Sequence, residues 1–324
     1  MIKVKRKDCP EILKRDLDPI SDGELEMQDV LNFYNIPANL NQAYQRTGIR
    51  GYRTEQSYTA YKDITVREDL KQIFHGKCAY CESKITSIYN GDIEHFRPKG
   101  GYCNNSKQPL NKPGYFWLAS EWENLLFACP FCNQTNTHKI FTGEEGYIEI
   151  KEVVLGKLNQ FPLMTEVHRL QPSDGFNYFS NKILYDISFN LEESERLLLK
   201  PCVDEVEDYF KYNDDGLILA NTDLDAFKVE QAKVSIKVYA LQRISLVQAR
   251  KEKLIQVKAQ IRRVEQAIRN YNNYSDNTIE EKTWFEGIMR EEMEVLKRFK
   301  DDDQEYAGLA RYIIDNYFDD FLSF

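Results

Sequence analysis

Apolar residues recur at helical spacing between residues 66 and 74. Val66, Leu70, Ile73 and Phe74 fall at positions i, i+4, i+7 and i+8, which places them on one face of an α-helix. Gly76 follows, and a glycine just past the last helical turn is a common C-cap because it adopts positive φ without strain. The pattern therefore predicts a helix over about residues 66–76.

Shorter patterns predict strands and loops in the next part of the chain. Residues 85–97 are rich in isoleucine, which favours short β-structure. Residues 99–114 are rich in Gly, Asn and Pro, which is loop composition. Residues 117–127 are mostly apolar and should pack in the core before a short helix that begins near Asn133. Further on, an Asp-Asp-Gly turn leads into a predicted strand at residues 217–219.

The C-terminal third carries the longest helical pattern. Residues 224–271 contain neither Gly nor Pro, and one unbroken helix of that length would extend roughly 70 Å. A second helical pair is predicted over residues 278–300 and 304–322. Together with the short strands, these patterns predict an α+β fold that is mostly helical.

Composition narrows the class of protein. A chain of 324 residues is long enough for about two domains, and 42% of its residues are hydrophobic. No run approaches the roughly 20 apolar residues of a membrane span, and residues 1–17 have no hydrophobic signal core, so we expect a cytoplasmic protein. The seven cysteines are then expected to be thiols or metal ligands, with Cys9, Cys103 and Cys202 as ordinary reduced side chains.

Four cysteines form two Cys-x-x-Cys pairs. Cys78 and Cys81 make the first pair, Cys129 and Cys132 make the second, and 47 residues lie between the pairs. Four thiolates supply the tetrahedral coordination that Zn²⁺ prefers, and they leave no open position for water. The sequence therefore predicts a structural zinc site, which contributes on the order of 10–16 kcal/mol of apparent folding free energy.

Acidic, histidine and asparagine residues lie between and beside these pairs. A neutral histidine such as His95 is a suitable base for activating water, because its ordinary pKa is near 6.5. Mg²⁺ or Mn²⁺ takes oxygen ligands, which Asp92, Glu94 and the amide of Asn133 can provide. Asn124 is the candidate for accepting from the ring N–H of His95 and fixing its tautomer. This set of residues indicates hydrolysis of a phosphodiester.

The same residues resemble the HNH (ββα-metal) endonucleases, in their His-Asn-Asn form with zinc knuckles. The resemblance implies that His95 is the general base, that Glu94 and Asn133 bind the catalytic metal, and that Asn124 orients His95. It also implies a β-hairpin followed by a helix, clamped by zinc at both ends.

Two questions about the metal ligands stay open at this level. The family's third metal-binding histidine would fall at Thr137, and His138 beside it is the alternative. In a regular strand Asp92 and Glu94 share a face and the next residue points to the other face, so the HNH geometry needs a bulge or a strand end there. The family pattern alone favours Glu94.

Five phrases resemble a narrower family, the PtuB-type HNH proteins of Septu and related retron antiphage systems. They are D-I-E-H-F-R-P-K at 92–99, N-L-L-F-A-C-P-F-C-N at 124–133, F-P-L at 161–163, L-L-K-P-C-V-D at 198–204 and A-x-x-S-I-K-V-Y-A-L-Q-R at 232–243. This resemblance implies an SMC/ABC-like ATPase partner of the PtuA type and a role in defence against phage. The family spacing makes residues 142–158 look like an insertion.

These expectations divide the chain into four parts. They are an N-terminal segment over 1–60, an HNH module with the four-cysteine zinc site over 61–141, a mixed linker or insert region over 142–223, and a helical domain over 224–324. DNA is the favoured substrate, and RNA, including tRNA, stays open. The alternatives are a zinc-stapled module that binds nucleic acid without cutting it, and a structural adaptor for the ATPase.

Charge is distributed unevenly along the chain. The net charge is −9 overall, but it is +3 over residues 71–140, +8 over 228–271 and −8 over 276–324. The basic stretch over 228–271 fits a solvated amphipathic helix, a surface facing nucleic acid, or a helix that docks the acidic tail or the ATPase. In the first basic region, Arg97 and Lys99 are read as solvated charges or as phosphate contacts.

Overall fold

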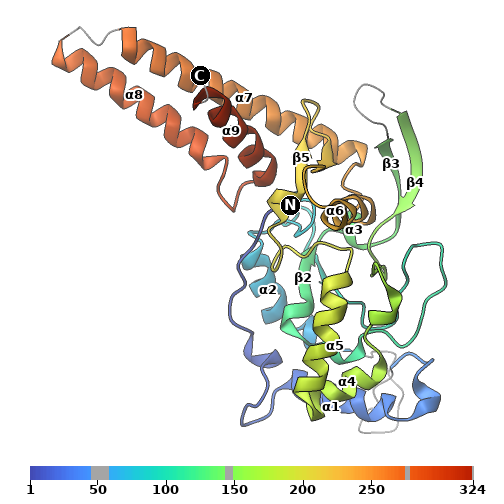
Figure 1. Ribbon diagram of the computed structural model, residues 1–324. Coiled ribbons are helices and arrows are strands. Elements are labelled where there is room, and N and C mark those ends of the chain that lie inside the picture. Colours follow the sequence, from blue (N-terminus) through green and yellow to red (C-terminus); the bar gives the residue numbers. More distant parts are fainter. Residues whose placement is uncertain (45–57, 143–148, 274–277, 323–324) are drawn as a thin grey trace.

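The three sheets of the fold are antiparallel pairs of strands, and helices make up most of the remaining secondary structure (Figure 1). A computed structural model describes residues 1–44, 58–142, 149–273 and 278–322. The strands are β1 (Asp92–His95), β2 (Leu125–Ala128), β3 (Asn136–Thr142), β4 (Glu149–Leu155), β5 (Phe210–Tyr212) and β6 (Ile218–Ala220). The helices are α1 (Asp22–Tyr34), α2 (Ile64–Ile73), α3 (Pro130–Asn133), α4 (Pro172–Ser180), α5 (Lys182–Glu195), α6 (Ala226–Val238), α7 (Ile244–Asn273), α8 (Ile279–Arg298) and α9 (Ala307–Leu322). The expected α+β class is confirmed.

The first predicted helix is confirmed with small shifts at its ends. α2 begins after Asp63, whose carboxylate accepts from the backbone N–H of Thr65 and caps the helix. Val66, Leu70 and Ile73 are its buried face. Gly76 has φ +69°, the conformation expected of a glycine after a helix end. The chain then turns directly into the first cysteine pair.

The short helix at the second cysteine pair lies earlier in the chain than predicted: it ends at Asn133, where the sequence pattern predicted that it would begin. α3 starts at Pro130, inside the Cys129–Cys132 pair, and Asn133 is its last residue. Proline is favoured in the first helical turn because its missing N–H would have no partner there. The next residue, Gln134, is extended and leads into β3. Asn133 therefore lies at the C-terminal end of a single helical turn.

Residues 224–271 do not form one unbroken helix. They form two helices, α6 and α7, which are separated by a break at residues 239–243. Ala240 has φ +50°, and the backbone N–H of Phe141 donates to the carbonyl of Gln242 in this break. Tyr239 is fully buried and stacks on Tyr80, with ring centroids 3.9 Å apart. Tertiary packing thus interrupts a segment that has no local helix breaker.

The predicted C-terminal helical pair is confirmed as α8 and α9. With α7 they form an arm that extends away from the rest of the molecule (Figure 1). The arm has a small apolar cluster of its own, made of Val257, Ile261, Val264, Leu296, Ala310 and Ile314. No helix in the described part of the chain is both long enough and apolar enough to span a membrane.

Part of the basic charge over 228–271 is engaged by other groups of the protein. Arg243 and Arg250 are buried, and Arg250 donates to the carbonyl of Leu241. Lys251 and Lys258 pair with two aspartates of the β5–β6 turn, at 2.7 and 2.6 Å. These contacts support an amphipathic helix that packs on the body of the protein and leave less free charge than the sequence count suggests.

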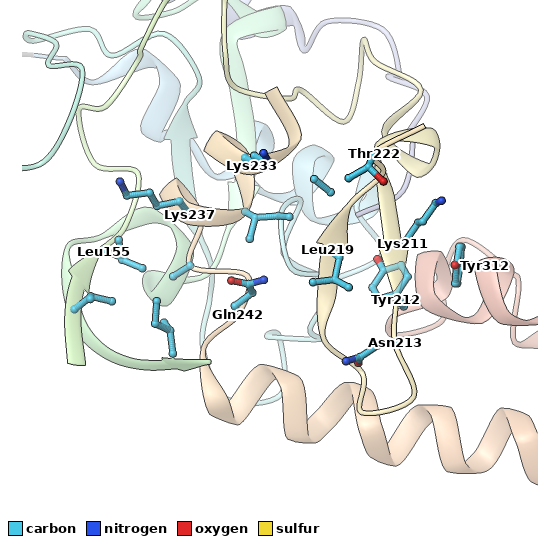
Figure 2. Close-up of a pocket in the computed structure, with 15 residues that line it drawn as sticks. Leu155, Lys211, Tyr212, Asn213, Leu219, Thr222, Lys233, Lys237, Gln242 and Tyr312 are labelled. Carbon is cyan, nitrogen blue, oxygen red and sulfur yellow. The ribbon is translucent and has the colours of Figure 1, made fainter. Parts of the chain in front are cut away.

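A concave surface lies between the β3–β4 hairpin, the β5–β6 hairpin and α6, and Figure 2 shows it in close-up. Its volume is about 1000 Å³. We call it the lysine groove, after the three lysines at its rim. Its lining residues are Ile140, Val153, Leu155, Lys211, Tyr212, Asn213, Leu219, Ala220, Thr222, Lys233, Ile236, Lys237, Ala240, Gln242 and Tyr312.

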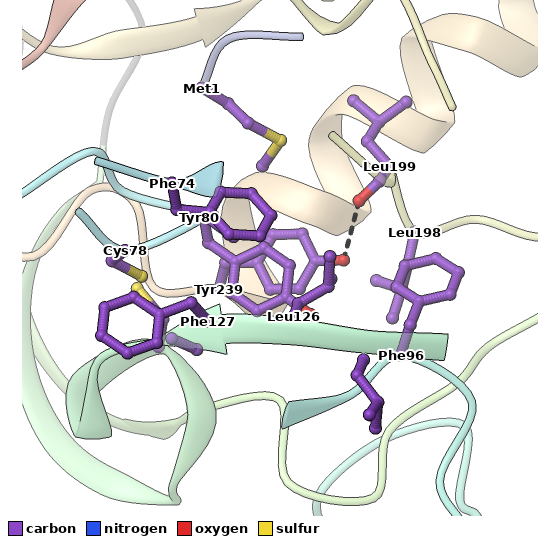
Figure 3. Close-up of a cluster of buried hydrophobic side chains, with 14 of the residues drawn as sticks. Met1, Phe74, Cys78, Tyr80, Phe96, Leu126, Phe127, Leu198, Leu199 and Tyr239 are labelled. Carbon is purple, nitrogen blue, oxygen red and sulfur yellow. Dashed lines mark hydrogen bonds between the residues drawn. The ribbon is translucent and has the colours of Figure 1, made fainter. Parts of the chain in front are cut away.

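The main core packs behind the first cysteine pair. Figure 3 shows the stacked rings of Tyr80 and Tyr239 against Phe74 and the β2 residues Leu126 and Phe127. The hydroxyl of Tyr239 donates to the carbonyl of Leu199 at 2.9 Å. Because β2 is fully buried, it forms a rigid base against which β1 is aligned.

The hairpin of β3 and β4 spans the expected boundary between residues 141 and 142. Residues 136–142 pair in register with residues 149–155. Part of the expected insertion, residues 143–148, lies outside the described residues. The segment that follows β4 returns to the second cysteine pair, where Lys157 and Leu158 contact the backbone of Cys132 and Asn133.

Candidate functional site

The two cysteine pairs meet at one buried point. The four sulfur atoms of Cys78, Cys81, Cys129 and Cys132 lie within 4.8 Å of one another, and the Sγ atoms of Cys81 and Cys129 are 3.8 Å apart. Sulfurs bound tetrahedrally at about 2.3 Å from Zn²⁺ would lie about 3.8 Å from one another. The donor set therefore fits a metal such as zinc. In the described residues, no other group of three or more His, Cys, Asp or Glu side chains is close enough to hold an ion.

Arg243 neutralises part of the negative charge that four thiolates bring. Its Nη1 atom donates to the Sγ of Cys132 at 3.4 Å, and its side chain is buried. The nearby thiolates hold the pKa of Arg243 above its ordinary value although burial acts in the opposite direction. The break between α6 and α7 places this arginine at the metal centre.

Strand β1 delivers the acidic residues and the histidine beside the metal centre. It pairs with β2 in a register that sets Asp92 opposite Ala128 and His95 opposite Leu125. The strand ends at His95. Asp92 is half-buried, whereas Glu94 and His95 are each 5% exposed. The three side chains thus have different access to solvent.

His95 is held by contacts on both ring nitrogens. Nε2 lies 2.9 Å from the carbonyl oxygen of Ala119 and therefore carries the proton that it donates there. Nδ1 then has the lone pair, and it accepts from the Nζ of Lys99 at 3.2 Å. The ring of Tyr61 covers it edge-on at 4.5 Å between centroids. Burial lowers the pKa of His95 well below 6.5, so the imidazole is neutral.

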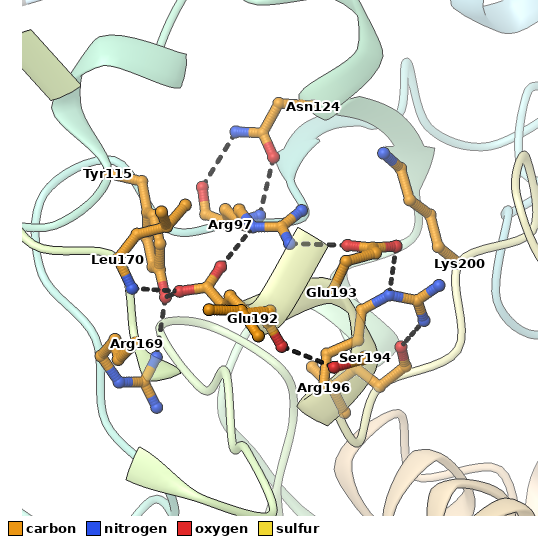
Figure 4. Close-up of polar contacts among 12 residues, drawn as sticks. Arg97, Tyr115, Asn124, Arg169, Leu170, Glu192, Glu193, Ser194, Arg196 and Lys200 are labelled. Atoms are coloured by element: carbon orange, nitrogen blue, oxygen red, sulfur yellow. Dashed lines mark hydrogen bonds and ion pairs between the residues drawn. The ribbon is translucent and has the colours of Figure 1, made fainter. Parts of the chain in front are cut away.

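Asn124 does not contact the His95 ring, so the expected tautomer contact is wrong. Its amide oxygen accepts from the backbone N–H of Arg97 at 2.8 Å, and its amide nitrogen donates to the carbonyl of Arg97 at 2.9 Å (Figure 4). It also donates to the carbonyl of Leu118 at 3.0 Å. Asn124 thereby fixes the backbone just after β1. The carbonyl of Ala119 takes the tautomer role, which a side-chain motif cannot reveal.

Asp92 and Asn133 lie together, and the catalytic metal that Glu94 or Asp92 was expected to bind with Asn133 stays a prediction. The Nδ2 atom of Asn133 donates to the Oδ2 atom of Asp92 at 3.0 Å, and Gln134 donates to the same oxygen at 3.1 Å. They line a cavity of about 510 Å³. Its other lining residues are Tyr61, Lys62, Arg67, Tyr89, Asn90, Gly91 and Ile93. Tyr61 lines this cavity and also packs edge-on against the His95 ring, so Tyr61 links the cavity to the histidine.

Glu94 is engaged by Lys157, a residue that the sequence analysis did not single out. The Nζ atom of Lys157 lies 2.5 Å from Oε1 of Glu94 and donates to the carbonyl of His95 at 2.8 Å. Lys157 is 0% exposed. Burial raises the pKa of Glu94, and the ammonium of Lys157 acts against that rise. The ion pair is thus a buried charge pair in the middle of the candidate site.

The segment after β4 carries Lys157 to this position. The N–H groups of Lys157 and Leu158 donate to the carbonyls of Cys132 and Asn133, at 2.9 and 2.5 Å. Gly156 has φ +139°, and a Cβ there would meet the carbonyl oxygen of Gln134 at 1.9 Å. We call residues 155–158 the lysine strap. The only sequence signal for it is the Gly-Lys pair shortly before the Phe-Pro-Leu phrase, inside the expected insertion.

Arg97 is neither a solvated charge nor a phosphate contact, so both readings are wrong. It is 2% exposed and pairs with Glu192 and Glu193 of α5, at 2.8 and 2.6 Å (Figure 4). Glu192 also accepts from the hydroxyl of Tyr115 at 2.7 Å. Arg97 therefore ties the β1 segment to α5. Lys99 is the cation of this phrase that reaches the histidine.

His138 lies near Phe131 and Arg243, next to the four clustered cysteines, and not with Asp92. Its ring faces that of Phe131, and burial together with Arg243 lowers the pKa of His138. Thr137, at the family's position for a third ligand, is exposed on β3. In the part of the chain that the structure describes, His138 joins no acidic residue in a group that could hold a metal.

Comparisons with known proteins agree with the motifs. No family model matches the chain. Septu protein PtuB of Bacillus mycoides (strain KBAB4) is 33% identical over 255 residues, which cover 77% of this chain and 66% of that protein. Septu protein PtuA of the same strain is 26% identical over 181 residues, covering 56% of this chain and 20% of that protein. The chain thus spans just under two thirds of that PtuB and a fifth of that PtuA.

Proposed function

We propose that this chain, which resembles a PtuB-type Septu protein, is a metal-dependent HNH endonuclease that hydrolyses phosphodiester bonds of nucleic acid. The observation that carries the proposal is the state of His95. Its imidazole is neutral, its tautomer is fixed by the carbonyl of Ala119, and its remaining lone pair accepts from Lys99. The Lys99 ammonium lies over the ring of Tyr61, which lines the cavity that contains Asp92 and Asn133. The imidazole is thus held in the form that can accept a proton at Nδ1 once the Lys99 ammonium leaves it.

The chemistry assigned to His95 is the removal of a proton from water. A water attacks phosphorus and its proton passes to Nδ1 of His95, while the bond from phosphorus to the leaving oxygen breaks. The leaving oxygen takes a proton from solvent water, and His95 later returns its proton to solvent. Nδ1 becomes available when Lys99 moves its ammonium away from the ring. An incoming phosphate supplies the reason for that move, because it attracts the ammonium more strongly than a neutral imidazole does. Lys62 and Arg67 at the cavity add positive charge for the phosphate.

Asp92 and Asn133 are the residues that would hold Mg²⁺ or Mn²⁺. Their carboxylate and amide oxygens are the ligand types that such ions prefer, and both line the cavity next to the histidine. When bound there, the ion would polarise the phosphate and stabilise the leaving oxygen. Glu94 is the family's choice of ligand, and it would join this set if it left Lys157.

The biological setting follows from the relatives. PtuB and PtuA are both named as Septu proteins, and the match to PtuB covers 77% of this chain. On this ground we propose a role as effector of an antiphage defence system, with an SMC/ABC-like ATPase of the PtuA type as partner. DNA is the favoured substrate. An RNA nuclease of the same fold, with tRNA as one target, is the second candidate.

The proposal is tested by a cleavage assay on plasmid, phage DNA and total RNA. The full chain is incubated with Mg²⁺, with Mn²⁺ and with EDTA, each in the presence and absence of the ATPase. Cleavage that needs the divalent ion is the expected result, and the substrate that is cut decides between DNA and RNA. If the zinc-loaded protein cuts nothing while the ATPase is present, a binding module or an ATPase adaptor replaces the nuclease.

The dependence of the cleavage rate on pH should show the loss of the positive charge of Lys99. Burial, aided by Lys62 and Lys157, lowers the pKa of Lys99 to about 8, so its positive charge is lost as pH rises through that value. We expect the rate in Mg²⁺ to fall above about pH 8. On the acid side the rate should persist below pH 6.5, because the pKa of His95 is held well below 6.5. Single-turnover rates between about pH 5 and about pH 9.5 measure both limbs.

The variant Lys99→Arg isolates the alkaline limb. Arginine keeps its charge at every pH of the assay, so the fall above about pH 8 should move to higher pH in this variant. An alkaline limb that stays in place with arginine would remove Lys99 as its cause.

A further inference from the structure

The lysine groove has cations at its rim and no carboxylate among its lining residues (Figure 2). Lys233 and Lys237 lie one turn apart on α6, and both are exposed. Within the described part of the chain, neither side chain forms an ion pair. Lys211, on the β5 side, pairs with Asp223 at 2.6 Å, and that aspartate is 74% exposed. The rim therefore presents uncompensated positive charge to any molecule that enters.

The floor of the groove is aliphatic. Ile140, Val153 and Leu219 are half-buried, and Leu155 and Ile236 below them are buried. These side chains come from both hairpins and from α6, so they converge from elements far apart in the sequence (Figure 2). A concave aliphatic surface gains free energy when another apolar surface displaces its water. Its ligand should thus carry apolar groups next to negative ones.

We propose that the lysine groove binds a segment of a partner protein in which aliphatic side chains are flanked by Asp or Glu. The aliphatic side chains would cover the floor, and the carboxylates would meet Lys233 and Lys237. Charge complementarity at the rim and the aliphatic character of the floor commit the site to this chemistry. The proposal concerns a surface outside the candidate catalytic site and does not depend on nuclease activity.

Single-stranded nucleic acid fits the groove less well. Its bases bind mainly by stacking on open aromatic faces. The aromatic residues of the lining are Tyr212 and Tyr312, which lie together at one end of the groove with their ring centroids 5.7 Å apart (Figure 2). Tyr212 is also buried, at 7% exposure. The floor between the lysines offers aliphatic contacts where a base would need a ring.

The groove is connected to the candidate site through the lysine strap. Leu155 belongs to the floor, and Lys157, two residues further on, contacts Glu94 and His95. A segment seated on Leu155 would therefore press on the element that positions the acidic residue and the histidine. Through this connection, a partner bound in the groove can change the position of Lys157 relative to Glu94 and His95.

Selection from a library of short random peptides displayed on phage tests the proposal. The full chain serves as bait, and Lys233→Glu/Lys237→Glu serves as the counter-bait. Peptides that bind the wild type and not the counter-bait should be enriched in Leu, Ile or Val next to Asp or Glu. Absence of such peptides, or peptides rich in Lys and Arg, would overturn the proposal.

A binding measurement with one selected peptide places it in the groove. Lys233→Gln/Lys237→Gln should weaken binding roughly fivefold, because two ion pairs at the surface are lost. The control Lys84→Gln/Lys107→Gln removes two exposed lysines elsewhere and should leave affinity unchanged. Equal affinity in all three proteins would overturn the proposal. It would also be overturned if a single-stranded oligonucleotide, and not the peptide, lost binding to the groove variant.

Discussion

Replacing Cys81 with serine should abolish metal binding and unfold the centre of the protein. Four thiolates would hold the ion, and a structural zinc contributes on the order of 10–16 kcal/mol of apparent folding free energy. Whole domains are stable by only about 5–15 kcal/mol, so this loss is comparable with the total. The four cysteines join the turn after α2 to the end of β2, and the main core packs directly behind them. The measurement is zinc content together with thermal unfolding.

The control for this prediction is Cys103→Ser. Cys103 is buried like the metal-binding cysteines but lies outside their cluster. The Cys103→Ser protein should keep a full complement of zinc and a cooperative thermal unfolding transition. If Cys81→Ser unfolded at the wild-type temperature, or if purified wild type held no metal, the structural zinc would be refuted.

Lys157→Met should destabilise the fold by about 3–5 kcal/mol near neutral pH, because it leaves the carboxylate of Glu94 buried without its partner. Methionine fills similar space, so the charge is the main change. Burial already raises the pKa of Glu94, and removing the ammonium raises that pKa further. The folded state then holds the Glu94 proton more tightly than the unfolded chain. The destabilisation should therefore grow as pH rises above about 4.3, the ordinary pKa of Glu.

Chemical denaturation at several pH values measures this effect. The double variant Glu94→Gln/Lys157→Met should recover much of the lost stability, since no buried charge remains unpaired. Lys200→Met is the matched control. Lys200 is also buried, but its ammonium lies over the ring of Phe96 at 5.3 Å and forms no ion pair in the described residues, so its replacement should cost much less. Equal losses for Lys157→Met and Lys200→Met would contradict a specific role for Lys157.

Local sequence patterns were sufficient to predict the elements that are determined by residues close together in the chain. The spacing of Val66, Leu70 and Ile73 predicted α2, and Gly76 predicted its end. The two Cys-x-x-Cys pairs predicted a metal centre because each pair is a complete local unit that needs only one partner. The acidic residues and the histidine of β1 were singled out from the same kind of local pattern, and their roles stay a prediction.

Contacts between distant segments were beyond the reach of the sequence. Lys157 looks like any lysine until the strap brings it to Glu94, 63 positions earlier in the chain. Arg97 looked like a surface cation because its partners lie on α5. Nothing local at Ala240 announces the break between α6 and α7, which exists because the stacked tyrosines and β3 hold the backbone there. The tautomer of His95 depends on a backbone carbonyl, which is present at every residue and so gives no pattern.

The rate of phosphodiester cleavage by His95→Ala, compared with wild type, tests the central claim most directly. His168→Ala is the matched control, because that histidine is half-exposed and contacts Glu195 away from the metal centre. With zinc content equal in all three proteins and the ATPase present, the account predicts a roughly 10²–10⁴-fold loss for His95→Ala and no loss for His168→Ala. Cleavage by His95→Ala at the wild-type rate would show that another residue activates the water and would contradict the account.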